Sequence, residues 1–369
     1  MIRAGGKQAG ARVTPDFFAI MGSAVRNNAS DIHIKVGKPP ILRLDGLLRE
    51  LNLPPLEEAR VTKELATLCI AAGVEPLPEQ ASQLDFSHHE EGLGRFRCHL
   101  YRQQGSWAAT LRVIPEAVPS FVDLRLPPIA QSITELDRGI VLITGATGQG
   151  KSTTAASILA SMAKSRSIHI LTIENPIEFV IPGEVASVSQ RAVGIDVESY
   201  EQALEAAFRE DPDVLFIDEL RSVKALEVAL HAGESGHLCI STIHTADALS
   251  TISRIGSMVA EDLRRSILAR LADSLRVVVS QRLVPLATPP GRVLAAEVMV
   301  ATATVRDVIR DPGKHKSLPS VISREGPASN AQTFDQALMT LVRANLISLD
   351  SARGAASNPD DLTRAMRLS

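Results

Sequence analysis

Hydrophobic and polar positions follow one pattern in residues 14–115 and a different one from Ile129 onward. In the first part, short segments alternate between apolar and polar residues, which is typical of strands with one buried face. Other segments carry apolar residues at helical spacing. The predicted elements are helices over 14–28 and 61–72, strands over 30–36, 41–44, 95–101 and 108–114, and a hairpin turn at Asp45-Gly46. Together they predict a small α+β domain, residues 1–116.

The second part contains nearly continuous apolar runs, as expected for parallel strands that helices cover on both faces. The predicted strands are 139–144, 168–173, 214–217, 238–243 and 293–300, and the predicted amphipathic helices include 200–208 and 334–346. Residues 129–369 therefore predict an α/β domain whose last part, about 302–369, is mainly helical. The Pro-rich segment 117–128 predicts a linker between the two domains.

Composition narrows the class of protein. The chain has 369 residues, of which 45% are hydrophobic, and a net charge of −3, which together predict a globular protein of two or three domains. Without a basic excess it does not fit a nucleic-acid coat protein. The basic N-terminus is not followed by an apolar run, and no segment is apolar enough to span a membrane. Cys69, Cys98 and Cys239 lie far apart, which favours a reducing, cytoplasmic location.

A phosphate-binding loop is the most specific motif. Gly145-Ala146-Thr147-Gly148-Gln149-Gly150-Lys151-Ser152 matches G-x-x-x-x-G-K-[ST], follows a predicted strand and, with Thr153, opens a predicted helix. The glycines let backbone N–H groups surround a phosphate, and the helix N-terminus adds partial positive charge. We expect Lys151 to reach the terminal phosphates and the Ser152 hydroxyl to hold Mg²⁺. The loop predicts a site for a nucleoside triphosphate.

Carboxylates end two of the predicted parallel strands. Asp213–Glu219 is an apolar strand closed by Asp218 and Glu219, and it resembles a Walker B segment. Strand alternation predicts that only one of these two acids faces the site. Glu174 ends the preceding strand and is a candidate for polarising the attacking water.

Histidines give weaker signals. His237 and His244 bracket one strand about 23 Å apart, at about 3.3 Å per residue, so they cannot bind one ion together. His244, at the carboxyl end, is a candidate sensor of the γ-phosphate. For His237, at the start of the strand, a structural role and a functional role are equally well supported. The run His88–Glu91 predicts a solvated hairpin loop rather than a metal site.

Read in order, these segments resemble the type II/type IV secretion ATPases, and among them most closely the pilus retraction ATPases. The resemblance runs from about Ser30 to Leu362. The matching segments are Ser30–His33, Pro39–Gly46, Gly94–Arg97, Leu111–Pro115, Thr172–Phe179 (the Asp box), Arg209–Arg221 (Walker B) and Gly233–Thr245 (the His box).

The resemblance implies a PAS-like N-terminal domain, a RecA-like ATPase domain and a ring-shaped homohexamer that uses ATP and Mg²⁺. It implies that Glu174 is the catalytic base and Glu219 the Walker B acid. Arg95, Arg97 and Arg112 match the arginines that complete the nucleotide site. It further implies a cytoplasmic protein at the inner membrane, held there by a platform protein of a pilus or secretion machine, with no nucleic-acid partner.

The chain departs from the family pattern at several points. Asn175 stands where the Asp box usually has a second acid, and Asp218 stands where glycine usually precedes the Walker B glutamate. Val305–Arg310 only approximates the surroundings of the retraction motif, so hydrolysis is better supported than retraction. The four-cysteine zinc motif of the assembly ATPases is absent from the sequence.

The leading hypothesis is an ATP-driven hexameric motor for pilus retraction and twitching motility, or for related type II/IV secretion. One alternative is a regulatory paralogue that binds nucleotide but hydrolyses it weakly, which Asn175 and Asp218 motivate. A conjugation or effector-secretion ATPase with similar motifs also stays open. A nucleic-acid translocase ranks last, because aromatic residues make up only 3% of the chain.

Overall fold

The chain divides into two units, Met1–Glu116 and Ala117–Ser369. The computed structural model describes residues 15–44, 46–114, 117–288 and 291–368. Thr14, Asp45 and residues 115–116, which fall within the predicted helix, turn and domain boundary, lie outside the described residues.

The first unit is built on an antiparallel sheet in the order β3-β2-β1-β6-β5-β4. Its strands are β1 (Asp31–Ile34), β2 (Ile41–Leu44), β3 (Leu47–Glu50), β4 (Gln83–Glu90), β5 (Gly94–Gln103) and β6 (Ser106–Ile114), and its helices are α1 (Pro15–Arg26) and α2 (Glu58–Ala71). The alternating positions Phe96, Cys98 and Leu100 of β5 face inward and pack in one core with Phe17 of α1 and Leu65 of α2.

The prediction for His88–Glu91 was wrong in part. His88 and Glu90 belong to β4, not to a solvated loop, and both side chains are buried. His88 Nε2 lies 2.8 Å from Glu90 Oε2. The two residues are two positions apart and therefore share one face of the strand. Because all four residues of the run are polar, the sequence does not show that two of them are buried.

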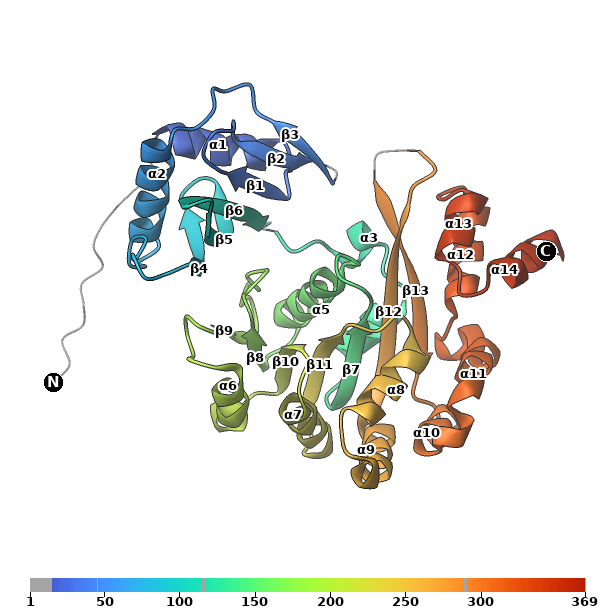
Figure 1. Cartoon of the computed structure of the whole chain (residues 1–369). Coiled ribbons are helices and arrows are strands. Elements are labelled where there is room, and N and C mark those ends of the chain that lie inside the picture. The colour runs from blue at the N-terminus through green and yellow to red at the C-terminus, as the bar shows by residue number, and fades with distance from the viewer. Residues whose placement is uncertain (1–14, 45, 115–116, 289–290, 369) are drawn as a thin grey trace. The chain divides into compact units, whose positions relative to one another are not determined.

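The second unit is a seven-stranded sheet in the order β13-β12-β7-β11-β10-β8-β9, parallel except for the antiparallel pair of β12 and β13 (Figure 1). The strands are β7 (Gly139–Thr144), β8 (His169–Glu174), β9 (Ser187–Ala192), β10 (Val214–Glu219), β11 (Leu238–Ile243), β12 (Leu275–Pro285) and β13 (Arg292–Val300). Of these, β9 and β12 are not predicted by the sequence pattern.

Both faces of this sheet are covered, which explains the continuous apolar runs. On β7, Val141 and Ile143 face a core shared with α4 (Ile129–Thr134) and α5 (Lys151–Ser165). Ile140 and Leu142 face the opposite core. That second core is shared with α6 (Tyr200–Ala206), α7 (Val223–Glu234), α8 (Ala248–Ser257), α9 (Glu261–Ser274), α10 (Ala303–Arg310) and α11 (Leu318–Glu325). The predicted two-part α/β fold is confirmed.

Residues 117–128 are not a free linker. They contain a short helix, α3 (Phe121–Leu124), whose N-terminus is capped by a capping box between Ser120 and Asp123. Val118 and Phe121 pack on the core beneath α5, and Ser157 Oγ of α5 donates to Pro119 O at 2.7 Å. The prolines restrict this segment, and its apolar side chains fasten it to the second unit.

The C-terminal helices pack beside the β12–β13 hairpin (Figure 1). They are α12 (Phe334–Arg343), α13 (Leu349–Ala355) and α14 (Pro359–Leu368). Phe334 and Ala352 share a core with Val284 of β12. From β12, the Arg282 guanidinium covers the Phe334 ring at 3.7 Å and donates to Ala355 O at 2.6 Å. No helix among the described residues is both long and apolar enough to cross a bilayer.

Candidate functional site

The phosphate loop lies at the carboxyl end of β7. Gly145 adopts φ 148°, and a Cβ there would come within 2.8 Å of the Gln281 carbonyl oxygen, so this close approach to β12 needs glycine. Gly150 is left-handed at the N-cap of α5, which begins at Lys151. The N-terminal N–H groups of α5 therefore open toward the loop, as phosphate binding requires.

Strand β12 holds the loop from the side. Gln149 Oε1 accepts from the Leu283 backbone N–H at 2.6 Å, and Gln281 Nε2 donates to Thr154 Oγ1 of α5 at 2.7 Å. These bonds join the loop and the first turn of its helix to one strand.

Lys151 is placed for anion binding. Its side chain is largely buried, and its Nζ donates to Ala146 O at 3.1 Å and lies 3.5 Å from His244 Nδ1. Burial lowers the pKa of Lys151, and the negative charges of Glu219 and Asp218 oppose that shift. A phosphate would supply the further negative charge that this ammonium needs.

His244 follows β11 and lies between Lys151 and Glu219 at the end of β10. Its Nε2 lies 3.6 Å from Glu219 Oε1, and Arg221 Nε lies 3.5 Å from the other oxygen of the same carboxylate. The Tyr200 hydroxyl donates to Glu219 O at 2.9 Å, which fixes the backbone at the end of the strand. The structure thus brings Lys151, His244 and Glu219 together, as the sequence predicts.

The expectation that only one of Asp218 and Glu219 faces the site was wrong. Asp218 lines a small cavity together with Ser152 and Glu174, while Glu219 contacts His244. The pairing of β10 with β11 shifts register between Ile217 and Glu219, and this irregularity breaks the alternation on which the expectation rested. Two acids therefore lie near the phosphate loop.

Glu174 is the most deeply buried acid of the group, with 7% of its surface exposed. Thr172 Oγ1 donates to Glu174 Oε1 at 2.7 Å, and Gln190 Nε2 donates to the same oxygen at 2.9 Å. Burial raises the pKa of Glu174 to about 7, although these two hydrogen bonds pull it down. A carboxylate with a pKa near neutrality can accept a proton from water at physiological pH.

The oxygen donors beside the loop suit Mg²⁺. Ser152 and Asp218 line one cavity, and burial raises the pKa of Asp218 to about 6, with the nearby charge of Glu178 adding to the shift. A divalent cation would offset the negative charge of these neighbouring carboxylates. Mg²⁺ prefers oxygen ligands and usually takes only one or two from the protein, the others being phosphates and water.

The three candidate arginines belong to the first unit. Arg112 on β6 lies directly across from Arg97 on β5 and from Asp31 on β1. Arg112 Nε donates to Asp31 Oδ1 at 3.1 Å, and Arg43 also pairs with Asp31 at 3.7 Å. Arg95 lies two positions before Arg97 on the same strand, and therefore on the same face. Asp31 is thus paired with Arg112, and Arg97 adds a further positive charge beside this ion pair.

His237 lies at the opposite end of β11 from His244. Its Nδ1 lies 2.9 Å from Ser235 Oγ, and its ring packs edge-on against Phe208 at 5.5 Å. These contacts support the structural interpretation of His237.

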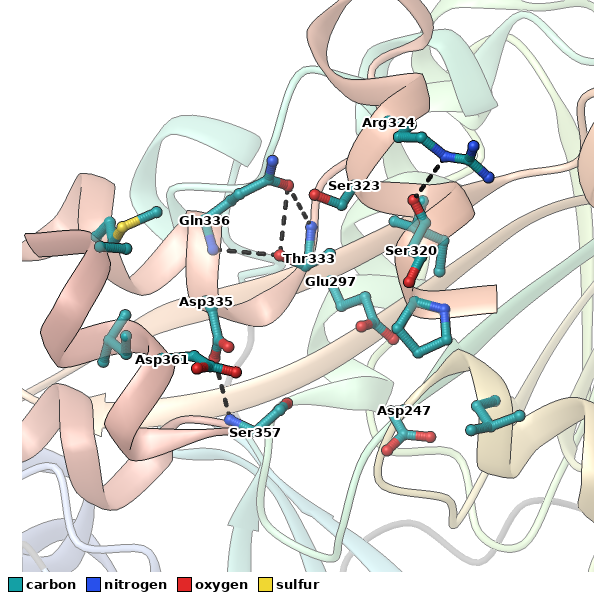
Figure 2. A pocket seen from close by; sticks show the side chains of 16 residues that line it. Asp247, Glu297, Ser320, Ser323, Arg324, Thr333, Asp335, Gln336, Ser357 and Asp361 are labelled. Atoms are coloured by element: carbon teal, nitrogen blue, oxygen red, sulfur yellow. Dashed lines mark hydrogen bonds between the residues drawn. The ribbon is translucent and has the colours of Figure 1, made fainter. Parts of the chain in front are cut away.

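A second cavity, of about 640 Å³, lies between α8, β13, α11, α12 and α14. Figure 2 shows the carboxylates of Asp247, Glu297, Asp335 and Asp361 around it. Glu297 is 6% exposed, and its Oε1 accepts from the Ala248 N–H at 2.8 Å, at the start of α8. Burial raises the pKa of Glu297 to about 7.

Glu297→Gln is expected to stabilise the protein in alkaline solution. The carboxyl ionises near pH 4.5 when unfolded but near pH 7 when folded, so its contribution to stability falls as pH rises through this window. Glutamine keeps the acceptor for Ala248 without the charge. We expect the free energy of unfolding to rise by roughly 1–3 kcal/mol at pH 8 and to change little at pH 5. Urea denaturation at both pH values measures this, and an equal effect at both would contradict it.

The sequence pattern missed three residues that support the site: Thr172, Gln190 and Tyr200. Tyr200 is indistinguishable from the apolar stripe of its helix, although its hydroxyl reaches β10. Thr172 lies two positions before Glu174, a spacing that places both side chains on one face of the strand and was an available signal. Gln190 lies on a strand that the sequence pattern does not predict.

Comparison with known proteins gives a consistent result. Residues 7–345 match the family described as Type II/IV secretion system protein. The chain is 36% identical to the type IV pilus retraction ATPase PilT of Pseudomonas aeruginosa over 94% of its own length and 99% of that protein. It is also 36% identical to a twitching motility protein of Neisseria gonorrhoeae, over 88% of this chain and 86% of that one.

The fold agrees with these sequence matches. A crystal structure of the pilus retraction motor PilT with bound ADP superposes with a TM-score of 0.84 and 38% identity, covering 94% of this chain and 98% of that one. The phosphate loop and the acids around it therefore lie in a fold that is known to hold a nucleotide. The chain belongs to the Type II/IV secretion system protein family and is an ATPase of that family.

Proposed function

We propose that the chain is the subunit of a homohexameric motor that hydrolyses ATP with Mg²⁺ to retract a type IV pilus or to drive a related secretion machine. The observation that carries the proposal is the cluster formed by Lys151, His244 and Glu219, next to the buried carboxylate of Glu174. The motor would act in the cytoplasm, on the platform protein of the machine at the inner membrane, without a nucleic-acid partner.

Each residue of the cluster has a role in hydrolysis. The N–H groups of residues 145–153 and the Lys151 ammonium bind the β- and γ-phosphates of ATP. Glu174 orients a water molecule and accepts its proton as the oxygen attacks the γ-phosphorus and the bond to ADP breaks. Ser152 would hold Mg²⁺, with Glu219 as the Walker B acid, and the bound ion would supply positive charge to offset that of the phosphates. His244 contacts both Lys151 and Glu219 and so senses whether the γ-phosphate is present.

Arginines of the N-terminal domain would complete the site, since the transition state spreads negative charge over the γ-phosphoryl oxygens. We expect Arg97→Ala to lower kcat at least 100-fold with little change in the KM for ATP. Arg112→Ala is expected to have a smaller effect, because Asp31 already binds that guanidinium. Steady-state kinetics of both variants test this order, with Arg43→Ala as a control that removes the other arginine paired with Asp31. A larger loss for Arg112 would reverse the assignment.

The proposal as a whole is tested in a piliated strain from which the gene is deleted. If it is right, the strain keeps extended pili and loses twitching motility, and the wild-type gene restores movement. Purified protein would show Mg²⁺-dependent ATP turnover. Nucleotide binding without turnover would favour the regulatory paralogue, and turnover that rises with added DNA would favour a translocase. Normal twitching with defective secretion would place the motor in a secretion machine.

A further inference from the structure

Gln190 connects Glu174 to the chain segment that follows it. Its Nε2 donates to Glu174 Oε1 and to Phe179 O, each at 2.9 Å, and its Oε1 accepts from the Ile181 N–H at 2.8 Å. One amide group thus joins the end of β8 to residues 179–181. All four residues line the small cavity that also contains Ser152 and Asp218.

The sheet register places this amide beside the carboxylate. Gln190 on β9 lies directly across from Thr172 on β8, and Thr172 shares its face with Glu174. Thr172 from the same strand and Gln190 from the neighbouring strand therefore donate to the same oxygen of Glu174, Oε1. Two donors on one oxygen fix the rotation of the carboxylate. Oε2 is then the oxygen that neither Thr172 nor Gln190 holds.

We infer that Gln190 is a positioning residue that holds the Glu174 carboxylate in the orientation needed to accept a proton from the attacking water. The inference rests on the proposed function, in which Glu174 is the base. The side chain acts through Glu174 and through the segment 179–181, and it needs no contact with the nucleotide. A carboxylate displaced by about 1 Å loses up to about 100-fold in rate, because proton transfer depends on the geometry of attack.

Two substitutions separate the bonds that Gln190 makes. Gln190→Met keeps the length of the side chain and removes all three hydrogen bonds. Gln190→Glu keeps an acceptor for the Ile181 N–H but, when ionised, has no donor for Glu174 and repels it. Ser189→Ala is the matched control, since Ser189 is the neighbouring residue on β9 and bonds to His169 rather than to Glu174.

We expect Gln190→Met and Gln190→Glu each to lower kcat about 10- to 100-fold, with Gln190→Glu the slower. The KM for ATP and the affinity for a non-hydrolysable ATP analogue should change less than about threefold, because the phosphate loop is untouched. Ser189→Ala should keep wild-type kcat. Turnover and analogue binding are measured on the full chain, and circular dichroism confirms that each variant folds.

The outcomes separate the inference from the function on which it rests. Wild-type kcat in Gln190→Met would overturn the inference, and so would a loss confined to ATP affinity, because a merely structural side chain would act that way. Glu174→Gln is measured in parallel. If that variant keeps full turnover, the assignment of Glu174 as base fails and the role of Gln190 fails with it. If it is inactive while Gln190→Met is fully active, only the inference fails.

Discussion

Replacement of Lys151 by alanine is expected to abolish ATP turnover, lowering kcat/KM by about 10³-fold or more. The ammonium is held over the phosphate loop by the Ala146 carbonyl and contacts His244. Its removal takes the one loop cation away from the phosphates and leaves Asp218 and Glu219 to repel them. Both ground-state binding and transition-state stabilisation should therefore suffer.

The matched control for this variant is Lys164→Ala, which removes an exposed lysine in the last turn of the same helix α5. It should retain wild-type turnover. Phosphate release with and without Mg²⁺, and binding of a fluorescent ATP analogue, measure the two effects. Residual turnover within tenfold of wild type in Lys151→Ala would show that the measured hydrolysis does not occur at this loop.

The second large effect is expected from Glu174→Gln, which should lower kcat by about 10²- to 10⁴-fold while ATP still binds. Glutamine is nearly isosteric but cannot accept the proton of the attacking water. Because burial raises the pKa of Glu174 to about 7, the ionised fraction grows as pH rises through neutrality. Wild-type kcat should therefore increase from pH 6 to pH 8, and the residual rate of the variant should not follow that increase.

Glu184→Gln provides the control, since Glu184 is an exposed glutamate downstream of the same strand. It should reproduce the wild-type rate and the wild-type pH profile. A pH profile in Glu174→Gln that keeps the wild-type midpoint would assign the titration to another group, and Asp218, with a pKa raised to about 6, would be the first to examine.

The sequence predicted well those features that depend on residues close together in the chain. The phosphate loop is a contiguous motif between a strand and a helix, and all of its residues fall where the motif places them. The acids of β8 and β10 come together because parallel neighbouring strands end at one edge of the sheet, a rule that needs no knowledge of the remaining fold. His244 follows by the same rule from β11.

What the sequence did not predict depends on contacts between distant segments. The β10 irregularity that brings both Asp218 and Glu219 to the site is a property of the pairing with β11. Gln190 reaches Glu174 only because β9 joins the edge of the sheet beside β8. The attachment of residues 117–128 to the second unit comes from Val118 and Phe121, whose burial a proline-rich composition conceals.

Strand β12 contacts both the phosphate loop and the C-terminal helices. Three consecutive residues contact different parts of the molecule: Gln281 binds the first turn of α5, Leu283 binds the phosphate loop through Gln149, and Arg282 between them binds α12 and α13. Strand alternation sends the middle side chain to the opposite face from its neighbours. A movement of the loop that displaced residues 281 and 283 would therefore also displace Arg282 and disturb its contacts with Phe334 and Ala355 of the C-terminal helices.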